Sequence, residues 1–131
     1  MKLHHIGIAV EDMTAAIGLY HATLGGQLQR RGRSDTEDME YALLEVGGSE
    51  LELMHSTDVS SPLGKFLAKW GPGVHHVAYE VEDLDGEVER LREAGCEIVG
   101  GVRPGVHGTR VTFIHPRSMG GVLTELVERS R

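Results

Sequence analysis

Residues 3–13 of this chain read LHHIGIAVEDM, and residues 74–84 read VHHVAYEVEDL. From the first histidine onward, the two segments share five identities in ten positions, together with two conservative apolar matches. A chain of 131 residues therefore writes the same His-His segment twice. Self-similarity at a fixed offset is the signature of a duplicated supersecondary unit.

A second matched pair lies further along the chain. GGSELELM at residues 47–54 and GGVLTELV at residues 120–127 share both glycines, a glutamate and the leucine after it. The histidine pairs recur at an offset of 71 residues and the shared glutamates at an offset of 73. Two matches at nearly one offset predict an internal duplication, with two copies related by a pseudo-twofold axis.

Each copy is predicted to form a strand, a helix and then further strands. The β-rich His-His segments lead into helices expected over residues 13–24 and 84–94. Asp12 and Asp83 precede these helices as N-caps, and glycines follow both of them. Later strands are predicted at residues 39–46, 50–55, 97–99, 110–115 and 122–127.

The expected domain organisation follows from this pattern. We predict one domain over residues 1–131, made of two βαβββ modules at about 1–60 and 72–131. The linker at about 61–71 is expected to be helical, with Ser61 as its cap and a proline in the first turn. The length suits one ordinary domain, and 40% hydrophobic residues are enough for a core.

The charge and hydropathy of the chain limit the kinds of molecule that it is expected to bind. The formal net charge is -7, from 20 acidic and 13 basic residues, which disfavours general binding to nucleic acid or anionic membrane. The sequence shows no run of about 18 apolar residues and no signal-peptide pattern, so a cytoplasmic protein is expected. An anionic ligand would need a local basic patch, and the basic residues available for one are Arg30, Arg31, Arg33, Lys65, Lys69, Arg103, Arg110 and Arg117.

The repeated strands predict a ligand site on one face. Side chains alternate along a strand, so His5 shares its face with Gly7 and Ala9, and His76 shares its face with Ala78. A histidine beside very small residues has empty space next to it, which a packed core avoids and a ligand site needs. This favours His5 and His76 over the histidine that precedes each.

Glu52 and Glu125 complete a duplicated set. Each glutamate follows a strand neighbour that points to the opposite face, and a carboxylate on an inner face needs a partner. Two histidines and two carboxylates, supplied in pairs by the two copies, can surround one divalent cation. Mixed imidazole and carboxylate ligation suits Co²⁺, Ni²⁺, Mn²⁺ or Fe²⁺, and it can also hold Zn²⁺.

The motifs resemble a known family. HHIGIAVEDM, ELELM, SPLGKFLAKWGPGVHHVAYEVEDL, GVHGTRVTFIHPRS and GGVLTELVE are similar to segments of the methylmalonyl-CoA epimerase family. That family belongs to the vicinal oxygen chelate superfamily, which also includes glyoxalase I. The resemblance implies an α+β fold in which paired βαβββ modules form a U-shaped, partly open mixed sheet around a metal site. It also implies a homodimer.

The resemblance implies a ligand set and a reaction. The ligands carry over onto His5, His76 and Glu125, with Glu52 where family members have Glu or Gln, and they hold one divalent ion per chain, foremost Co²⁺. The reaction interconverts (R)- and (S)-methylmalonyl-CoA through an enolate, in propionyl-CoA metabolism. The metal would chelate the thioester and carboxylate oxygens as a Lewis acid, and acid/base groups would serve both faces of the α-carbon.

Glu125 is one expected acid/base group, and the second departs from the family pattern. A gapless alignment places the family glutamate on Thr36, whereas a shift of one residue recovers Glu37. We therefore assign the second role to Glu37, with Asp38 and Glu40 as alternatives.

The resemblance leaves the roles of several other residues undecided. His107 and His115 are equally consistent with substrate contact and with structural hydrogen bonding, and the residues that could approach the CoA phosphates are Lys65, Arg103 and Arg117. Two other functions are compatible with the same fold. One is a glyoxalase I-type isomerase or another metal-dependent lyase, and the other is a metal-free small-molecule binding protein.

Overall fold

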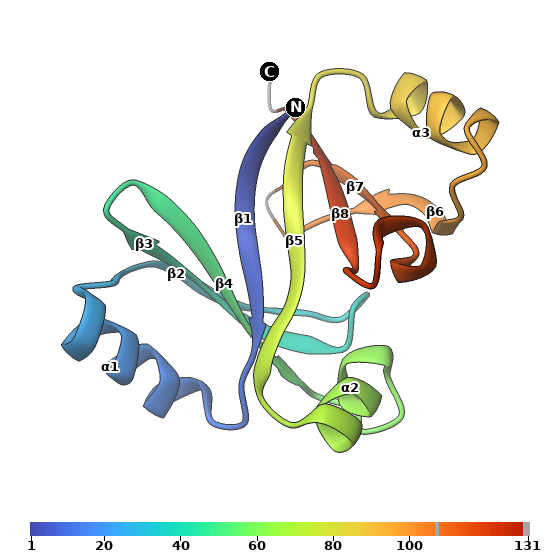
Figure 1. Ribbon diagram of the computed structural model, residues 1–131. Helices are drawn as coiled ribbons and strands as arrows, with labels where there is room; N and C mark the ends of the chain where they lie inside the picture. The colour runs from blue at the N-terminus through green and yellow to red at the C-terminus, as the bar shows by residue number, and fades with distance from the viewer. Residues whose placement is uncertain (107, 130–131) are drawn as a thin grey trace. The chain divides into compact units, whose positions relative to one another are not determined.

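A computed structural model describes residues 1–106 and 108–129 of the chain, and it divides into two compact units. The first module comprises residues 5–75, and the second comprises residues 1–4 with the chain from residue 76 onward. The boundary cuts strand β1 (Lys2–Ala9) after His4 and strand β5 (Gly73–Val81) after His75. Figure 1 shows the order of elements along the chain. Each copy runs strand, helix and three strands, as the duplication predicts.

The first module is a four-stranded sheet with a helix on one face. Within it the strand order is β2-β3-β4-β1, with β1 parallel to β4 and the other neighbours antiparallel. The elements after β1 are α1 (Met13–Leu24), β2 (Gln27–Ser34), β3 (Met39–Val46), β4 (Ser49–Ser56) and α2 (Pro62–Trp70).

Helix α1 begins and ends where the sequence predicts. The Asp12 side chain accepts a hydrogen bond from the Ala15 amide, and Gly25 ends the helix in the left-handed conformation at φ 68°. A residue with a Cβ adopts that conformation at a cost, which is why glycine is favoured there. The helix packs against one face of the sheet through a cluster that contains Val10, Met13, Ala42, Leu44 and Leu53.

The second module repeats this arrangement. Its strand order is β5-β8-β7-β6, with β5 parallel to β8. The elements after β5 are α3 (Leu84–Glu93), β6 (Ile98–Pro104), β7 (Arg110–Ile114), the short 3-10 helix η1 (Pro116–Met119) and β8 (Thr124–Glu128). Asp83 caps α3 by accepting from the Gly86 amide, and α3 packs on the sheet through Val81, Leu84, Val88, Leu91, Ile114 and Leu126.

The connecting helix α2 forms as expected within the stretch 61–71. Ser61 caps it by accepting from the Gly64 amide, and Pro62 occupies its first turn. A Cβ on Gly64 would lie 2.5 Å from the Asp58 carbonyl oxygen, so this position has room only for glycine. Of the described residues, no helix is long and apolar enough to cross a membrane.

Two strands differ most from the sequence-based expectation. β2 carries the basic stretch that contains Arg30, Arg31 and Arg33. The βαβββ pattern requires a third strand after the helix in the first copy, but the local sequence does not indicate its position. β2 lies at the end of the strand order and most of its side chains are exposed, so it lacks the apolar alternation that reveals a strand. β6 extends to Pro104 rather than ending at Val99, because it contains an irregularity between Val99 and Arg103.

Candidate metal centre

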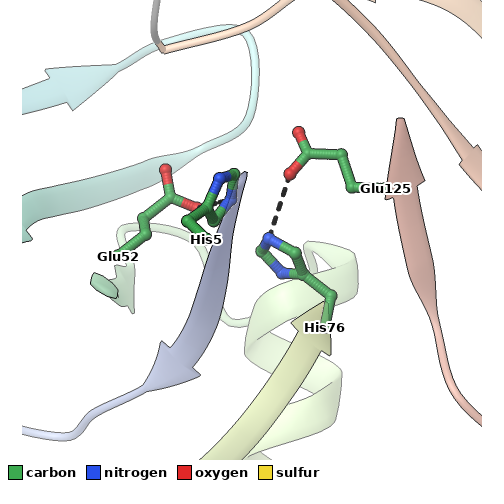
Figure 2. A group of neighbouring side chains, drawn as sticks. All are labelled: His5, Glu52, His76 and Glu125. Carbon is green, nitrogen blue, oxygen red and sulfur yellow. Dashed lines mark ion pairs between the residues drawn. The ribbon is translucent and has the colours of Figure 1, made fainter. Parts of the chain in front are cut away.

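The first module places His5 and Glu52 side by side. Gly7 on β1 pairs with Glu52 on β4, so both residues, with His5, lie on the sheet face opposite α1. The Nε2 atom of His5 lies 3.6 Å from a carboxylate oxygen of Glu52, and the two residues are 2% and 3% exposed. Figure 2 shows this pair, drawn from β1 and β4. We call this the His–Glu face of the first module.

The second module repeats the pair with His76 and Glu125. Ala78 on β5 pairs with Glu125 on β8, so both lie with His76 on the face opposite α3. The His76 Nε2 atom lies 3.0 Å from a Glu125 carboxylate oxygen, and the residues are 2% and 7% exposed. Figure 2 shows these two side chains pointing at one another. We call this the His–Glu face of the second module.

The donor chemistry of these pairs fits a divalent metal ion. Each pair supplies one imidazole nitrogen and one carboxylate oxygen, and each is buried where an uncompensated charge would be costly. The strand partners of the two glutamates are Gly7 and Ala78, which add no side-chain atom beyond a Cβ next to the carboxylates. Imidazole with carboxylate is a ligand combination that first-row divalent metals favour. Both pairs, predicted from the duplication, therefore exist within their modules.

The structure places Glu37 at the end of a hairpin rather than beside Glu52. Glu37 is half-buried in the turn between β2 and β3, and its amide donates to the Ser34 hydroxyl at 3.3 Å. Leu43 is the β3 partner of Glu52, and the turn enters β3 at Met39, four residues away. That separation corresponds to about 13 Å of strand.

The two alternatives to Glu37 are placed less favourably. Asp38 is exposed and adopts a positive φ of 51° in the same turn. Glu40 pairs with His55 and shares its side of β3 with Ala42 and Leu44, which belong to the cluster under α1. Glu40 therefore lies on the face opposite the one that carries Glu52.

Phe113 is a neighbour of the second pair that sequence reasoning missed. Its ring meets the His76 ring edge to face, with centroids 5.7 Å apart and planes at 85°. It pairs with Glu125 across β7 and β8, so it lies on the same face. The available signal was the β7 sequence, in which Val111 and Phe113 alternate with Thr112.

The other residues that the sequence offered for substrate contact have different surroundings in the structure. His115 accepts a hydrogen bond from the Arg117 amide and caps η1, which is the structural alternative for that histidine. His107 lies outside the described residues. The Arg117 guanidinium donates to Glu97 at 2.7 Å and lowers the pKa of that carboxyl. Arg103 lies over the Phe113 ring.

Comparison with known proteins agrees with this geometry. Residues 4–113 match the model of the Glyoxalase/Bleomycin resistance protein/Dioxygenase superfamily. The chain is 36% identical over 129 residues to the ethylmalonyl-CoA/methylmalonyl-CoA epimerase of Cereibacter sphaeroides, covering 95% of this chain and 96% of that protein.

Two solved structures are similar over nearly all of the chain. The crystal structure of methylmalonyl-CoA epimerase from Mycobacterium tuberculosis is 42% identical, with a TM-score of 0.93, over 99% of this chain and 89% of that one. A Streptomyces coelicolor methylmalonyl-CoA epimerase variant in complex with 2-nitronate-propionyl-CoA is 36% identical, with a TM-score of 0.94, over 100% and 99%. The predicted glyoxalase-like α+β fold class is confirmed.

Proposed function

The chain belongs to the Glyoxalase/Bleomycin resistance protein/Dioxygenase superfamily and within it to the methylmalonyl-CoA epimerases, and we propose that it interconverts (R)- and (S)-methylmalonyl-CoA. The observation that carries the proposal is the pair of buried His–Glu sites in a chain similar to epimerases along its whole length. The activity is an isomerase reaction, a 1,1-proton transfer at the α-carbon of the substrate. We propose that the single domain predicted over residues 1–131 carries out this reaction.

The proposed metal ligands are His5, Glu52, His76 and Glu125. We propose that they hold one divalent ion together, as the duplicated sequence predicts, with one imidazole and one carboxylate offered by each module. Co²⁺ is proposed first, with Ni²⁺, Mn²⁺ and Zn²⁺ as alternatives. When bound, the ion supplies Lewis acidity that stabilises the negative charge of the enolate.

Glu125 is proposed as one of the two acid/base groups. Its carboxylate is buried and lies 3.0 Å from His76, so its position is defined before substrate binds. In the forward direction the α-proton passes to a carboxylate oxygen, and the C–H electron pair enters the enolate. Return of a proton to the opposite face of that planar enolate inverts the α-carbon.

The opposite face needs a second group, and we propose Glu37 for it. Glu40 is disfavoured because it lies on the α1 face of its strand, and Asp38 because it is exposed. Glu37 is half-buried, and the Ser34 hydroxyl holds its backbone. Since the turn is about 13 Å along β3 from the Glu52 row, its side chain must extend back over the sheet to reach substrate.

Proton exchange in D₂O tests the function directly. Methylmalonyl-CoA is followed by proton NMR with metal-loaded protein, with chelated protein and with no protein. We expect deuterium to enter the α-position quickly only with the metal-loaded protein, well above the spontaneous rate. Equal exchange in all three samples would overturn the epimerase assignment.

Two further measurements, turnover of a hemithioacetal and metal content after purification, distinguish the alternative functions. A glyoxalase I-type isomerase or related lyase would turn over a hemithioacetal rather than exchange the α-proton of methylmalonyl-CoA. A metal-free binding protein would purify without a stoichiometric divalent ion. The homodimer and the cytoplasmic location stay predictions, and light scattering during gel filtration tests the first.

A further inference from the structure

Arg103 occupies a fixed place next to the second His–Glu pair. Its guanidinium carbon lies 4.9 Å from the centroid of the Phe113 ring, and the same ring meets the His76 ring edge to face. Since Phe113 pairs with Glu125 on β8, one aromatic ring separates the positive charge from both proposed ligands. Stacking of a guanidinium on an aromatic face is favourable and restricts its orientation.

The strand that carries Arg103 is distorted to present it. The register of β6 against β7 shifts between Val99 and Arg103, which is a bulge. Within it Gly100 and Gly101 have φ values of 73° and 74°, a conformation that side-chain-bearing residues rarely adopt. Bulges redirect side chains and occur often beside active sites.

A hydrogen bond from β7 holds the bulge, and the Arg103 guanidinium lies against it. The Thr112 hydroxyl, which is buried, donates to the Gly101 carbonyl at 2.8 Å. A Cβ on Gly100 would lie 2.8 Å from the Arg103 Nη1 atom, so the backbone passes directly against the guanidinium. The missing side chain at Gly100 therefore makes room for Arg103.

The register also fixes which face Arg103 occupies. Arg103 pairs with Val111 on β7, and Val111 lies on the same side of β7 as Phe113. Phe113 in turn pairs with Glu125 on β8, so all of these residues share one face of the sheet. Helix α3 covers the other side of this sheet through Ile114 and Leu126. Arg103 consequently lies on the His–Glu face of the second module, where a substrate of this site would bind.

We propose that Arg103 binds an anionic oxygen group of the acyl-CoA substrate and thereby helps to select it; this inference rests on the function proposed above. A guanidinium offers paired donors that match the oxygens of a carboxylate or a phosphate. The substrate carries both groups, in its malonyl carboxylate and in the phosphates of CoA. Arg117 is a weaker choice for this role because its exposed guanidinium is already paired with Glu97 at 2.7 Å.

Calorimetric binding of three thioesters to the metal-loaded protein separates these two sources. Malonyl-CoA carries the carboxylate and the phosphates, propionyl-CoA carries only the phosphates, and malonyl-pantetheine carries only the carboxylate. If Arg103 binds the carboxylate, Arg103→Gln should weaken malonyl-CoA and malonyl-pantetheine by about ten- to hundred-fold and spare propionyl-CoA. If it binds a phosphate, the same loss should affect malonyl-CoA and propionyl-CoA and spare malonyl-pantetheine.

Two variants control for charge and for stacking. Arg92→Gln removes an exposed arginine from α3 and should leave all three dissociation constants unchanged. Arg103→Lys keeps the charge but loses the planar fork, so it should recover part of the lost affinity. The proposal is overturned if Arg103→Gln changes no dissociation constant more than Arg92→Gln does. It is also overturned if all three ligands weaken equally, since that marks a purely structural role.

The binding assay and the exchange assay fail independently. A wild-type protein that binds malonyl-CoA through Arg103 but exchanges no α-proton would overturn the epimerase function and leave the anion contact standing. If the wild-type protein exchanges the α-proton and Arg103→Gln binds all three ligands as tightly as wild type, the epimerase function stands and the anion contact is overturned.

Discussion

At the scale of single residues, His76 tests the metal centre most directly. His76→Ala removes an imidazole whose Nε2 atom faces Glu125, so the variant should purify with at most a small fraction of the wild-type metal and should exchange no α-proton above background. Metal content by mass spectrometry and exchange in D₂O are the two measurements. His75→Ala is the matched control, because His75 packs against Phe66 instead. Equal metal content in His76→Ala and wild type would contradict the ligand assignment.

Glu125 should matter more for the reaction than for the fold. Glu125→Gln keeps the size and one oxygen of the side chain but cannot accept the α-proton. Exchange should fall by at least about hundred-fold, with the urea unfolding midpoint nearly unchanged. Glu89→Gln, on the exposed side of α3, supplies the control. A Glu125→Gln protein that exchanges at the wild-type rate would remove the acid/base role.

Glu37 and Glu40 form a matched pair because both belong to the β2–β3 hairpin, Glu37 in its turn and Glu40 on the α1 face of β3. Glu37→Gln should slow epimerisation by about hundred-fold, since the second face of the enolate loses its acid. Glu40→Gln should leave the rate near wild type, because that side chain lies on the α1 face. The measurement is the rate at which one enantiomer at the α-carbon of methylmalonyl-CoA converts into the other. Full activity in Glu37→Gln would transfer the role to another group.

At the scale of elements, the duplicated helix caps predict a local stability effect. Asp83 accepts from the Gly86 amide at 3.1 Å, and removal of such a cap costs about 1 kcal/mol. Asp83→Ala should lower the urea unfolding midpoint accordingly, while Asp83→Asn should retain most of the stability because its amide oxygen also accepts. An Asp83→Ala protein as stable as wild type would show that the cap contributes little to α3.

Element boundaries follow the local signals closely where the signal is strong. Helix α1 spans the predicted residues because an aspartate cap and a left-handed glycine bracket a run with helical spacing. β3 likewise covers the predicted residues 39–46. β2 carries a polar edge sequence without alternation, so its existence depends on pairing with β3. Pairing of that kind is not encoded in the period of one segment.

At the scale of the whole molecule, binding of the proposed metal should raise the free energy of unfolding. A ligand that binds only the folded state adds about 2.7 kcal/mol when its concentration is one hundred times its dissociation constant. Chelation should therefore lower the melting temperature of the wild-type protein by several degrees, measured by calorimetry, and readdition of Co²⁺ should restore it. The His76→Ala protein should melt at the same temperature with and without chelator. A wild-type protein indifferent to chelator would argue against the shared metal.

The sequence by itself determined the duplication, the α+β modules, the helix caps and the four His and Glu positions. These were readable because each depends on residues close together in the chain or on a repeat at one offset. Alternation along a strand was enough to place His5 with Gly7, and the β1–β4 register then put Glu52 on that face. The pairs His5–Glu52 and His76–Glu125 could be anticipated in this way.

Only the tertiary structure decided the rest. The face of Glu40, the distance of Glu37 from the Glu52 row and the stacking of Arg103 on Phe113 all depend on strand register. A register shift of one residue moves a side chain to the other face, and a bulge redirects the side chains beside it, without changing the local sequence pattern. Register is set by packing between segments far apart in the chain, and that is the physical reason why these features could be seen only in the folded molecule.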